Sequence, residues 1–162
     1  MSDPTGPTDS TDPALDPIAD REPRACRLIR TMYDAINRRD LDGAIACVDE
    51  DCRYEDLNFP EPFVGREAVR GLFAEFCEGM PEDLTFAIDE LAGDDRAVGV
   101  MWHLELGGIA FPNSRGASFY RISEGSGKLC FARDVVEPPF KPGKAVLPII
   151  KLVIPLVRRF LK

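Results

Sequence analysis

The second half of the chain contains four strand-like segments joined by turns, and this series restricts the fold more than any other feature. Apolar and polar residues alternate along each segment, as they do in strands that bury one face. The segments are residues 84–91, 97–106, 116–123 and 128–137. Gly-rich or Asp-rich hairpin signals separate them, so consecutive strands are expected to pair side by side. The sequence therefore predicts an antiparallel sheet.

Helical patterns occupy the chain before this sheet. From Pro23 onward, apolar residues recur at three- and four-residue steps until about residue 37, which is typical of an amphipathic helix. Asp40 is placed to cap a short second helix, and residues 66–77 form a third amphipathic pattern. A strand-like segment at residues 52–57 lies between the second and third helices. Helices that precede such a sheet must cover one of its faces, so we predict an α+β domain.

The two ends of the chain differ from this domain in composition and charge. Residues 1–20 are rich in Pro, Asp, Ser and Thr, which predicts a disordered acidic tail. Residues 138–162 contain six Lys or Arg and no acidic residue, and most of the others are apolar. We therefore divide the chain into the tail, a domain over residues 21–141 and a cationic amphipathic C-terminal helix over residues 142–162.

The overall charge and the cysteines argue against several kinds of protein. A formal net charge of −8 disfavours a nucleic-acid surface, because binding to phosphates requires a dense basic patch. The five cysteines are widely spaced and odd in number, which is typical of reduced thiols in a cytoplasmic protein. The N-terminus has neither a basic start nor an apolar segment, so we expect no secretory signal. With one histidine and no acidic cluster at ligand spacing, we expect no metal and no other cofactor.

Several stretches of the sequence resemble one superfamily. The stretches DLDGAIACVDEDCRYED, EPFVGREAV and YRISEGSGKLCFARDVVEP, in this order of elements, are similar to the SnoaL-like branch of the nuclear transport factor 2-like superfamily. The resemblance covers residues 24–140 and implies a curved sheet wrapped against three N-terminal helices, forming a cone with one pocket. The superfamily includes polyketide cyclases, ketosteroid isomerases, limonene epoxide hydrolases and scytalone dehydratases. One scaffold therefore carries unrelated chemistries.

Asp56 is the first candidate for chemistry. It precedes Gly65 by nine residues, and this stretch resembles the strand of ketosteroid isomerases in which an Asp transfers the proton. A carboxylate at the end of a strand that faces an apolar pocket is partly desolvated, which raises its pKa. The alternative is that Asp56 caps the Pro-rich loop that follows it. The positions that match the oxyanion donors of those isomerases hold Met32 and Ser118, which argues against ketosteroid isomerisation itself.

Arg133 and Glu137 are the second candidate pair. They lie four residues apart on one predicted strand, so their side chains project to the same side. The stretch GKLCFARDVVEP resembles a strand of limonene epoxide hydrolases, which implies that Glu137 helps to activate water and that Arg133 matches an Arg of that strand. The partner motif of those hydrolases falls on Trp102 and Leu104, so only half of that apparatus is present. The alternative is an ion pair between Arg133 and Glu137 that closes a polar end of the cone.

Aromatic and apolar residues are expected to line the pocket. In the segment at residues 97–106, Trp102 and Leu104 share one face of the strand, whereas His103 lies on the other. We expect the apolar face to border the pocket and His103 to point away from it. The predicted ligand-binding residues are Tyr33, Tyr54, Phe59, Phe63, Trp102, Leu104 and Tyr120.

The C-terminal segment allows two interpretations. Lys144, Lys151 and Arg158 repeat every seven residues, and two prolines interrupt an apolar run that is too short to span a bilayer readily. The segment either docks on the domain as a covering helix or lies on an anionic membrane as a peripheral contact. A bent helix wraps a curved protein surface more naturally than a flat bilayer, so we favour docking.

Together these features predict a homodimeric protein that acts on or binds a small apolar metabolite. The catalytic alternatives are isomerase, cyclase, dehydratase or epoxide hydrolase-like chemistry, with Asp56, Arg133 and Glu137 as the polar groups. The other interpretation is a non-catalytic binding module for a hydrophobic ligand. In one form of this interpretation, the C-terminal helix attaches the module to a membrane. If Asp56 and Glu137 face one cavity, the enzymatic interpretation gains support.

Overall fold

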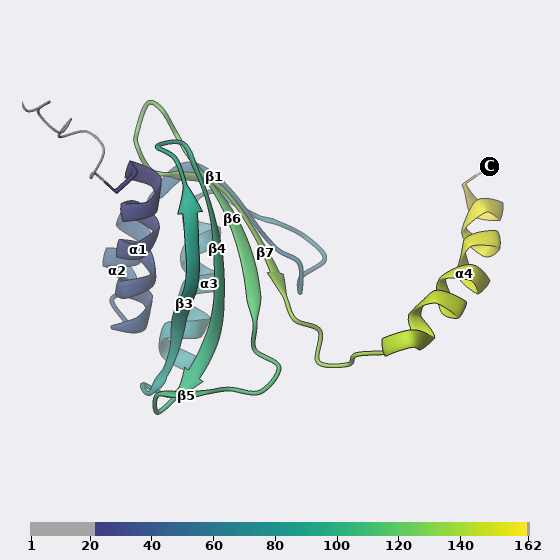
Figure 1. The fold of residues 1–162 in the computed structure, drawn as a ribbon. Helices are drawn as coiled ribbons and strands as arrows, with labels where there is room; N and C mark the ends of the chain where they lie inside the picture. Colours follow the sequence, from purple (N-terminus) through teal and green to yellow (C-terminus); the bar gives the residue numbers. More distant parts are fainter. Residues whose placement is uncertain (1–21, 162) are drawn as a thin grey trace, which may run out of the picture.

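The computed structural model describes residues 22–161, and its body is a curved sheet with three helices on one face (Figure 1). The helices are α1 (Arg24–Asn37), α2 (Leu41–Ala46) and α3 (Arg66–Gly79). The strands are β1 (Val48–Asp56), β2 (Phe63–Val64), β3 (Leu84–Gly93), β4 (Ala97–Leu106), β5 (Ile109–Ala110), β6 (Gly116–Ile122) and β7 (Leu129–Val136). The predicted α+β class is confirmed, while the acidic tail predicted for residues 1–20 lies outside the described residues.

The order of the strands differs in one respect from the prediction. The path through the sheet is β2-β1-β7-β6-β4-β3, with the short β5 paired to β4. Strands β3, β4, β6 and β7 form the expected antiparallel series, but β1 lies parallel to β7, so the sheet is mixed. Most of the domain lies between β1 and β7 in the sequence, and a connection of that length does not impose the antiparallel direction that a hairpin does.

The core lies between the helices and the concave face of the sheet. Helix α1 contributes Ile29 and Met32, which are fully buried, and each such side chain contributes about 2 kcal/mol through burial of apolar surface. Asp40 accepts a hydrogen bond of 2.9 Å from the backbone N–H of Gly43, which confirms it as the cap of α2. The five cysteines are free thiols, and three of them are buried in this core.

The C-terminal helix lies apart from the cone. After a 3-10 turn at Gly143–Ala145, helix α4 (Val146–Phe160) extends away from the sheet, and each of its residues is exposed (Figure 1). The docking that we favoured from the sequence is therefore wrong for this structure. The reason is the linker between β7 and α4, in which Pro138, Pro139 and Pro142 oppose a tight return to the body. Within residues 22–161, no helix is both long and apolar enough to cross a membrane.

Candidate functional site

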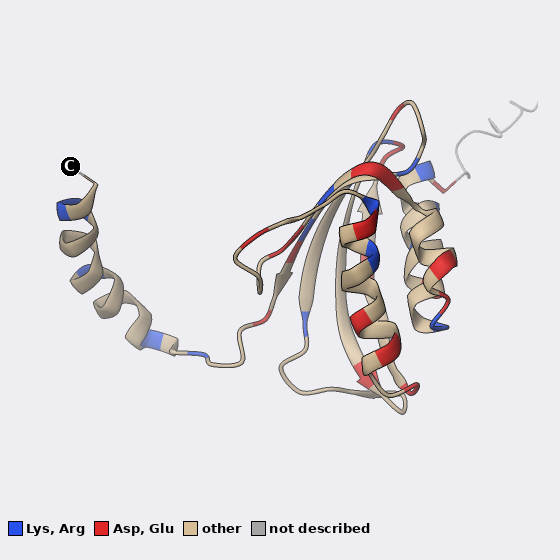
Figure 2. Ribbon diagram, turned by 180° about the vertical axis from the view of Figure 1, so that it is seen from behind, with Lys and Arg blue, Asp and Glu red and all other residues tan. Residues whose placement is uncertain are grey.

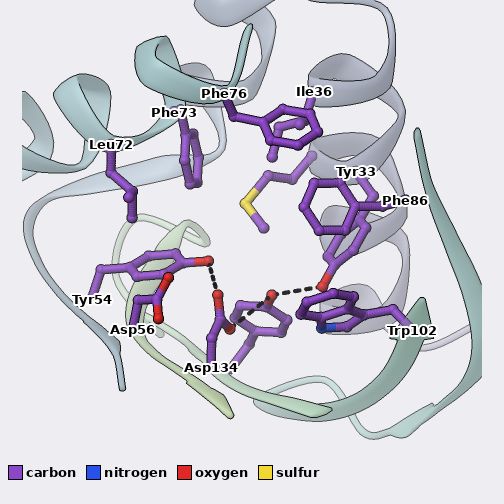
Figure 3. A pocket seen from close by; sticks show the side chains of 12 residues that line it. Tyr33, Ile36, Tyr54, Asp56, Leu72, Phe73, Phe76, Phe86, Trp102 and Asp134 are labelled. Carbon is purple, nitrogen blue, oxygen red and sulfur yellow. Dashed lines mark hydrogen bonds between the residues drawn. The ribbon is translucent and has the colours of Figure 1, made fainter. Parts of the chain in front are cut away.

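A cavity of about 140 Å³ lies inside the cone. Its apolar wall comes from the helices and consists of Met32, Ile36, Leu72, Phe73 and Phe76. The sheet forms the opposite wall, and two carboxyl groups, those of Asp56 and Asp134, lie on that side (Figure 3). The cavity therefore combines a hydrophobic surface with a small number of acidic groups, as binding sites for small molecules commonly do.

Three tyrosine hydroxyls form a hydrogen-bond network with the carboxyl group of Asp134 (Figure 3). Tyr54 donates to Oδ2 of Asp134 at 2.6 Å, and Tyr120 donates to Oδ1 at the longer distance of 3.4 Å. The hydroxyls of Tyr33 and Tyr120 are 2.9 Å apart. Because Tyr120 donates to Asp134, Tyr33 must donate to Tyr120. The four residues come from α1, β1, β6 and β7, so the network exists only in the folded domain.

The register of the sheet brings the polar residues together. Side chains alternate along β7, and Asp134 follows the buried Ala132 on the concave face. Asp134 is paired with Asp56 on β1 and with Ser118 on β6. Residues paired across neighbouring strands project to the same face, so the three side chains stand side by side on the concave surface.

Burial raises the pKa of Asp134 to about 6. Hydrogen bonding to the hydroxyls of Ser118, Tyr54 and Tyr120 opposes this rise, while the nearby charge of Asp56 adds to it. Burial also raises the pKa of Tyr54 and Tyr120 well above the usual value, so both phenols remain protonated donors. Asp134 can therefore take up and release a proton near neutral pH, which an ordinary exposed Asp does not do.

Trp102 closes the floor of the cavity and is held by two features of β6. Its indole N–H donates to the hydroxyl of the buried Ser118 at 2.8 Å. Gly116 lies under the indole ring, where a Cβ would come within 2.2 Å of a ring carbon. The ring also packs edge-on against Phe86, with centroids 5.0 Å apart. Gly116 therefore makes room for the aromatic wall, and a larger residue there would displace it.

Comparison with known proteins identifies the family. The sequence profile of the SnoaL-like domain matches residues 29–130, well over half of the chain. The chain belongs to the SnoaL-like domain family. No curated protein matches it.

Several solved structures share the fold of this SnoaL-like domain. One is a protein from Kribbella flavida whose name proposes a ketosteroid isomerase, with 23% identity, a TM-score of 0.58, and coverage of 74% of this chain and 82% of that chain. Another is an NTF2-like protein of unknown function from Mesorhizobium loti, with 18% identity, a TM-score of 0.59, and coverage of 71% and 92%. A protein of unknown function with a cystatin-like fold, from Methylobium petroleophilum, has 22% identity, a TM-score of 0.58, and coverage of 75% and 82%. At these identities the similarity shows the fold alone.

Asp56 of the SnoaL-like domain lies where the cavity meets the Pro-rich loop. Its side chain borders the cavity beside Asp134. Its Oδ1 also accepts a hydrogen bond of 2.9 Å from the backbone N–H of Asn58, at the start of the Pro-rich loop. Asp56 thus lies at the edge of the cavity, where it also orders the loop after β1.

Arg133 and Glu137 lie outside the cavity. Arg133 forms an ion pair of 2.6 Å with Glu55, and both side chains belong to the convex face of the sheet. Glu137 forms an ion pair with Lys141 and accepts a hydrogen bond of 3.3 Å from the backbone N–H of Arg115. Separate ion pairs therefore take the place of the direct Arg133–Glu137 pair that we considered, and Glu137 does not share a cavity with Asp56.

The remaining predicted residues divide between the cavity and its surroundings. Tyr33, Tyr54, Trp102 and Tyr120 border the cavity. Phe59 and Phe63 instead pack against each other beside the loop after β1, with ring centroids 5.2 Å apart, and Leu104 packs against the core. His103 lies on the convex face as expected, with its Nδ1 2.8 Å from Asp89.

Asp134 is the functional candidate that the sequence analysis missed. The signal that could have found it is the alternation of its strand, in which an acidic residue occupies the same face as Ala132 and Val136. An acid on the apolar side of a strand is unusual and marks a possible site. As for metals, no cluster of three or more His, Cys, Asp or Glu side chains within residues 22–161 is arranged to hold an ion.

Proposed function

We propose that this SnoaL-like domain binds a small apolar carbonyl compound inside the cone and transfers a proton on it. The observation that carries the proposal is Asp134, whose pKa is raised to about 6 in a cavity lined mainly by apolar and phenolic groups. A largely desolvated acid whose partners are hydroxyl groups rather than cations costs stability, so such an arrangement is typical of proton-transfer sites.

The geometry supports a stepwise transfer. Ionised Asp134 takes the proton from the carbon that lies between the carbonyl and a C=C bond of the substrate. The electron pair of that C–H bond forms a new C=C bond to the carbonyl carbon, and the π pair of the C=O bond moves to the oxygen, which gives a dienolate. Protonated Asp134 accepts the hydrogen bond of Tyr54 less strongly, and the Tyr54 hydroxyl then turns toward the enolate oxygen. Asp134 returns the proton to the γ-carbon of the dienolate, the remaining C=C bond becomes conjugated with the carbonyl, and the C=O bond re-forms. The product is an isomer, and Asp56 contributes by raising the proton affinity of Asp134.

The size of the cavity suggests the size of the substrate. A cavity of about 140 Å³ is close to the roughly 150 Å³ that accommodates a benzene molecule in a protein interior. A six-membered ring therefore fits between the apolar wall and Asp134. Larger substituents would pass Asp56 toward the loop that contains Phe59 and Pro60.

A test with a defined probe is exchange of carbon-bound hydrogen in 2-cyclohexenone, followed by NMR in D2O. We expect the protein to accelerate deuterium uptake over buffer, and we expect Asp134→Asn to remove the acceleration. Binding of the probe is followed separately through the fluorescence of Trp102, the single tryptophan of the chain, which borders the cavity. Acceleration that survives in Asp134→Asn would overturn the assignment of Asp134.

Binding without turnover is the second candidate. It is favoured by the hydroxyls of Tyr33, Tyr54 and Tyr120, each of which already donates to a protein group and so offers no free donor in the resting state. In this case the probe changes the fluorescence of Trp102 while deuterium uptake stays at the rate of buffer. The two measurements together distinguish the candidates.

A further inference from the structure

Helix α4 exposes a large apolar surface that nothing in the cone covers. It contains 15 residues, and none is buried. Leu147, Leu152 and Phe160 are 64%, 74% and 86% exposed, which is far more than residues of this kind usually are. A contiguous apolar surface of this kind marks an interaction site.

The polar residues of α4 gather on one side of the helix. At about 100° of rotation per residue, Lys151, Arg158 and Arg159 fall within an arc of about 100°. Pro148 and Pro155 fall in the same arc. Pro155 removes the helical partner of the Lys151 carbonyl, and that carbonyl lies on the polar side where water or headgroups can bond to it. The remaining arc of about 260° is entirely apolar.

This distribution favours lipid over protein as the occupant. A groove on a protein covers one side of a helix, usually a stripe of little more than 100°, and would leave much of the apolar arc of α4 in water. Lipid chains surround an interfacial helix on every side except the one facing the headgroups. With a length of about 22 Å, α4 is shorter than the roughly 30 Å hydrocarbon core, so it would lie in the interface rather than span it.

The charges of the two parts of the chain point to an anionic lipid surface. The segment 138–162 has six basic residues and no acid, whereas residues 24–137 carry a net charge of −9. Figure 2 shows acidic residues on several elements of the cone and only basic charged residues on α4. An anionic surface therefore attracts α4 and repels the cone. The linker with Pro138, Pro139 and Pro142 keeps the two parts separated.

We infer that α4 lies in the interface of an anionic membrane and tethers the cone above it. The apolar arc faces the acyl chains, and Lys151, Arg158 and Arg159 face the headgroups. This inference is independent of the chemistry proposed for Asp134, since α4 contributes no residue to the cavity.

Flotation of the full chain with lipid vesicles tests the inference. We expect co-flotation with vesicles of equal parts phosphatidylcholine and phosphatidylserine, weak co-flotation with phosphatidylcholine alone, and a decrease at high salt. Each basic residue at such a surface contributes about fivefold to the partition coefficient. The triple variant Lys151→Gln, Arg158→Gln, Arg159→Gln should therefore partition about a hundredfold more weakly.

A matched control variant removes the same number of positive charges from the cone. Arg38, Arg96 and Arg115 are exposed, and their joint replacement by Gln removes three positive charges without touching α4. We expect this control to partition at least as strongly as the unchanged protein. Equal weakening in both triple variants would mean that overall charge, and not α4, controls binding, and would overturn the inference.

A second measurement follows insertion directly. Phe160 lies opposite the basic residues, and Phe160→Trp places an indole there, while the emission of the buried Trp102 gives a constant background. A blue shift on addition of the anionic vesicles is expected. No shift and no flotation would overturn the inference. An oligomer that depends on α4, with no vesicle binding, would assign the helix to a second copy of the chain and would also overturn it.

Discussion

Acidic residues on the two faces of the sheet around β7 have pKa values that are shifted in opposite directions. On the concave face, burial raises the pKa of Asp134 to about 6. On the convex face, the hydrogen bond from Lys141 lowers the pKa of Glu137, and those from Arg53 and Arg133 lower the pKa of Glu55. The convex acids have cations and water to stabilise their charge, whereas Asp134 has phenols and apolar neighbours. Position on the strand, rather than residue type, therefore decides which acid can exchange protons near neutral pH.

Two residues that are adjacent in the sequence differ in the same way, one with a structural role and the other available for chemistry. Arg133 and Asp134 are adjacent, yet Arg133 joins β7 to β1 through an exposed pair with Glu55. Surface pairs of this kind contribute little to stability, because solvent screens the two charges. The convex residues thus hold neighbouring strands together, and the concave residue is available for function.

The largest expected effect is on proton transfer. With 2-cyclohexenone as the probe, Asp134→Asn should lower the rate of deuterium uptake by a factor of about one hundred or more, because general acid–base catalysis contributes at least that much. The matched convex variant Glu137→Gln should stay within about twofold, since it leaves the cavity unchanged. Equal losses of the deuterium-uptake rate in the two variants would contradict the functional difference between the concave and convex faces.

The pH dependence of the same reaction sharpens the assignment. The ionised form of Asp134 is the active one, and its pKa is about 6. The rate should therefore rise with pH and level off above 7, and at pH 5 it should be about tenfold below the plateau. A profile that is flat between pH 5 and 7 would contradict the role of Asp134 as the base.

The next effect concerns stability. Because the folded-state pKa of Asp134 is raised, ionisation opposes folding, and this cost grows as pH rises from about 4 to above 6. Asp134→Asn removes the cost, so its free energy of unfolding relative to the unchanged protein should increase by about 2 kcal/mol between pH 4 and 8, as measured by urea unfolding. For Glu137→Gln, the free energy of unfolding relative to the unchanged protein should instead decrease between pH 4 and 8. Because the pKa of Glu137 is lowered, its ionised form stabilises the fold above pH 4.5, and this stabilisation is lost as the pH falls. The same sign in both variants would refute the argument.

A smaller, concentration-dependent effect is expected for assembly. Met101 and Val135 face Ala117 from the two neighbouring strands, and their side chains are 54% and 49% exposed on the convex face. We expect this row to pair two copies of the chain, because an exposed apolar row on a sheet is a common interface. Light scattering at tens of micromolar should give the mass of a dimer, and Met101→Glu should give a monomer. Ile109→Glu, on the exposed β5, is the control that should remain dimeric.

The smallest expected effect is that of removing the C-terminal helix. Because no residue of α4 is buried, deletion of residues 143–162 should shift the thermal midpoint of the cone by less than about 2 °C. By contrast, Ile29→Ala in α1 should lower it by about 10 °C or more, since such a change in the core costs several kcal/mol. A large loss on deletion of α4 would instead mean that the helix packs on the cone in solution.

The sequence by itself determined the helices, the longer strands and their order along the chain. The segment at residues 97–106 is a strand with those bounds, the cap at Asp40 is present, and Trp102 faces inward while His103 faces outward. These features follow from local rules, because alternation, helical period and capping depend on residues that are close in sequence. The same rules located Asp56 at the end of its strand.

Only the tertiary structure decided which polar residues meet. The parallel pairing of β1 with β7 sets Asp134 beside Asp56 and within reach of Tyr54, and no local pattern specifies that register across 80 residues. The position of α4 apart from the cone was decided in the same way, since the spacing of its apolar residues does not show whether the domain offers a surface that covers them. Both outcomes depend on the free energy of contacts between distant segments, and that free energy is defined only when the surfaces that pack together are known.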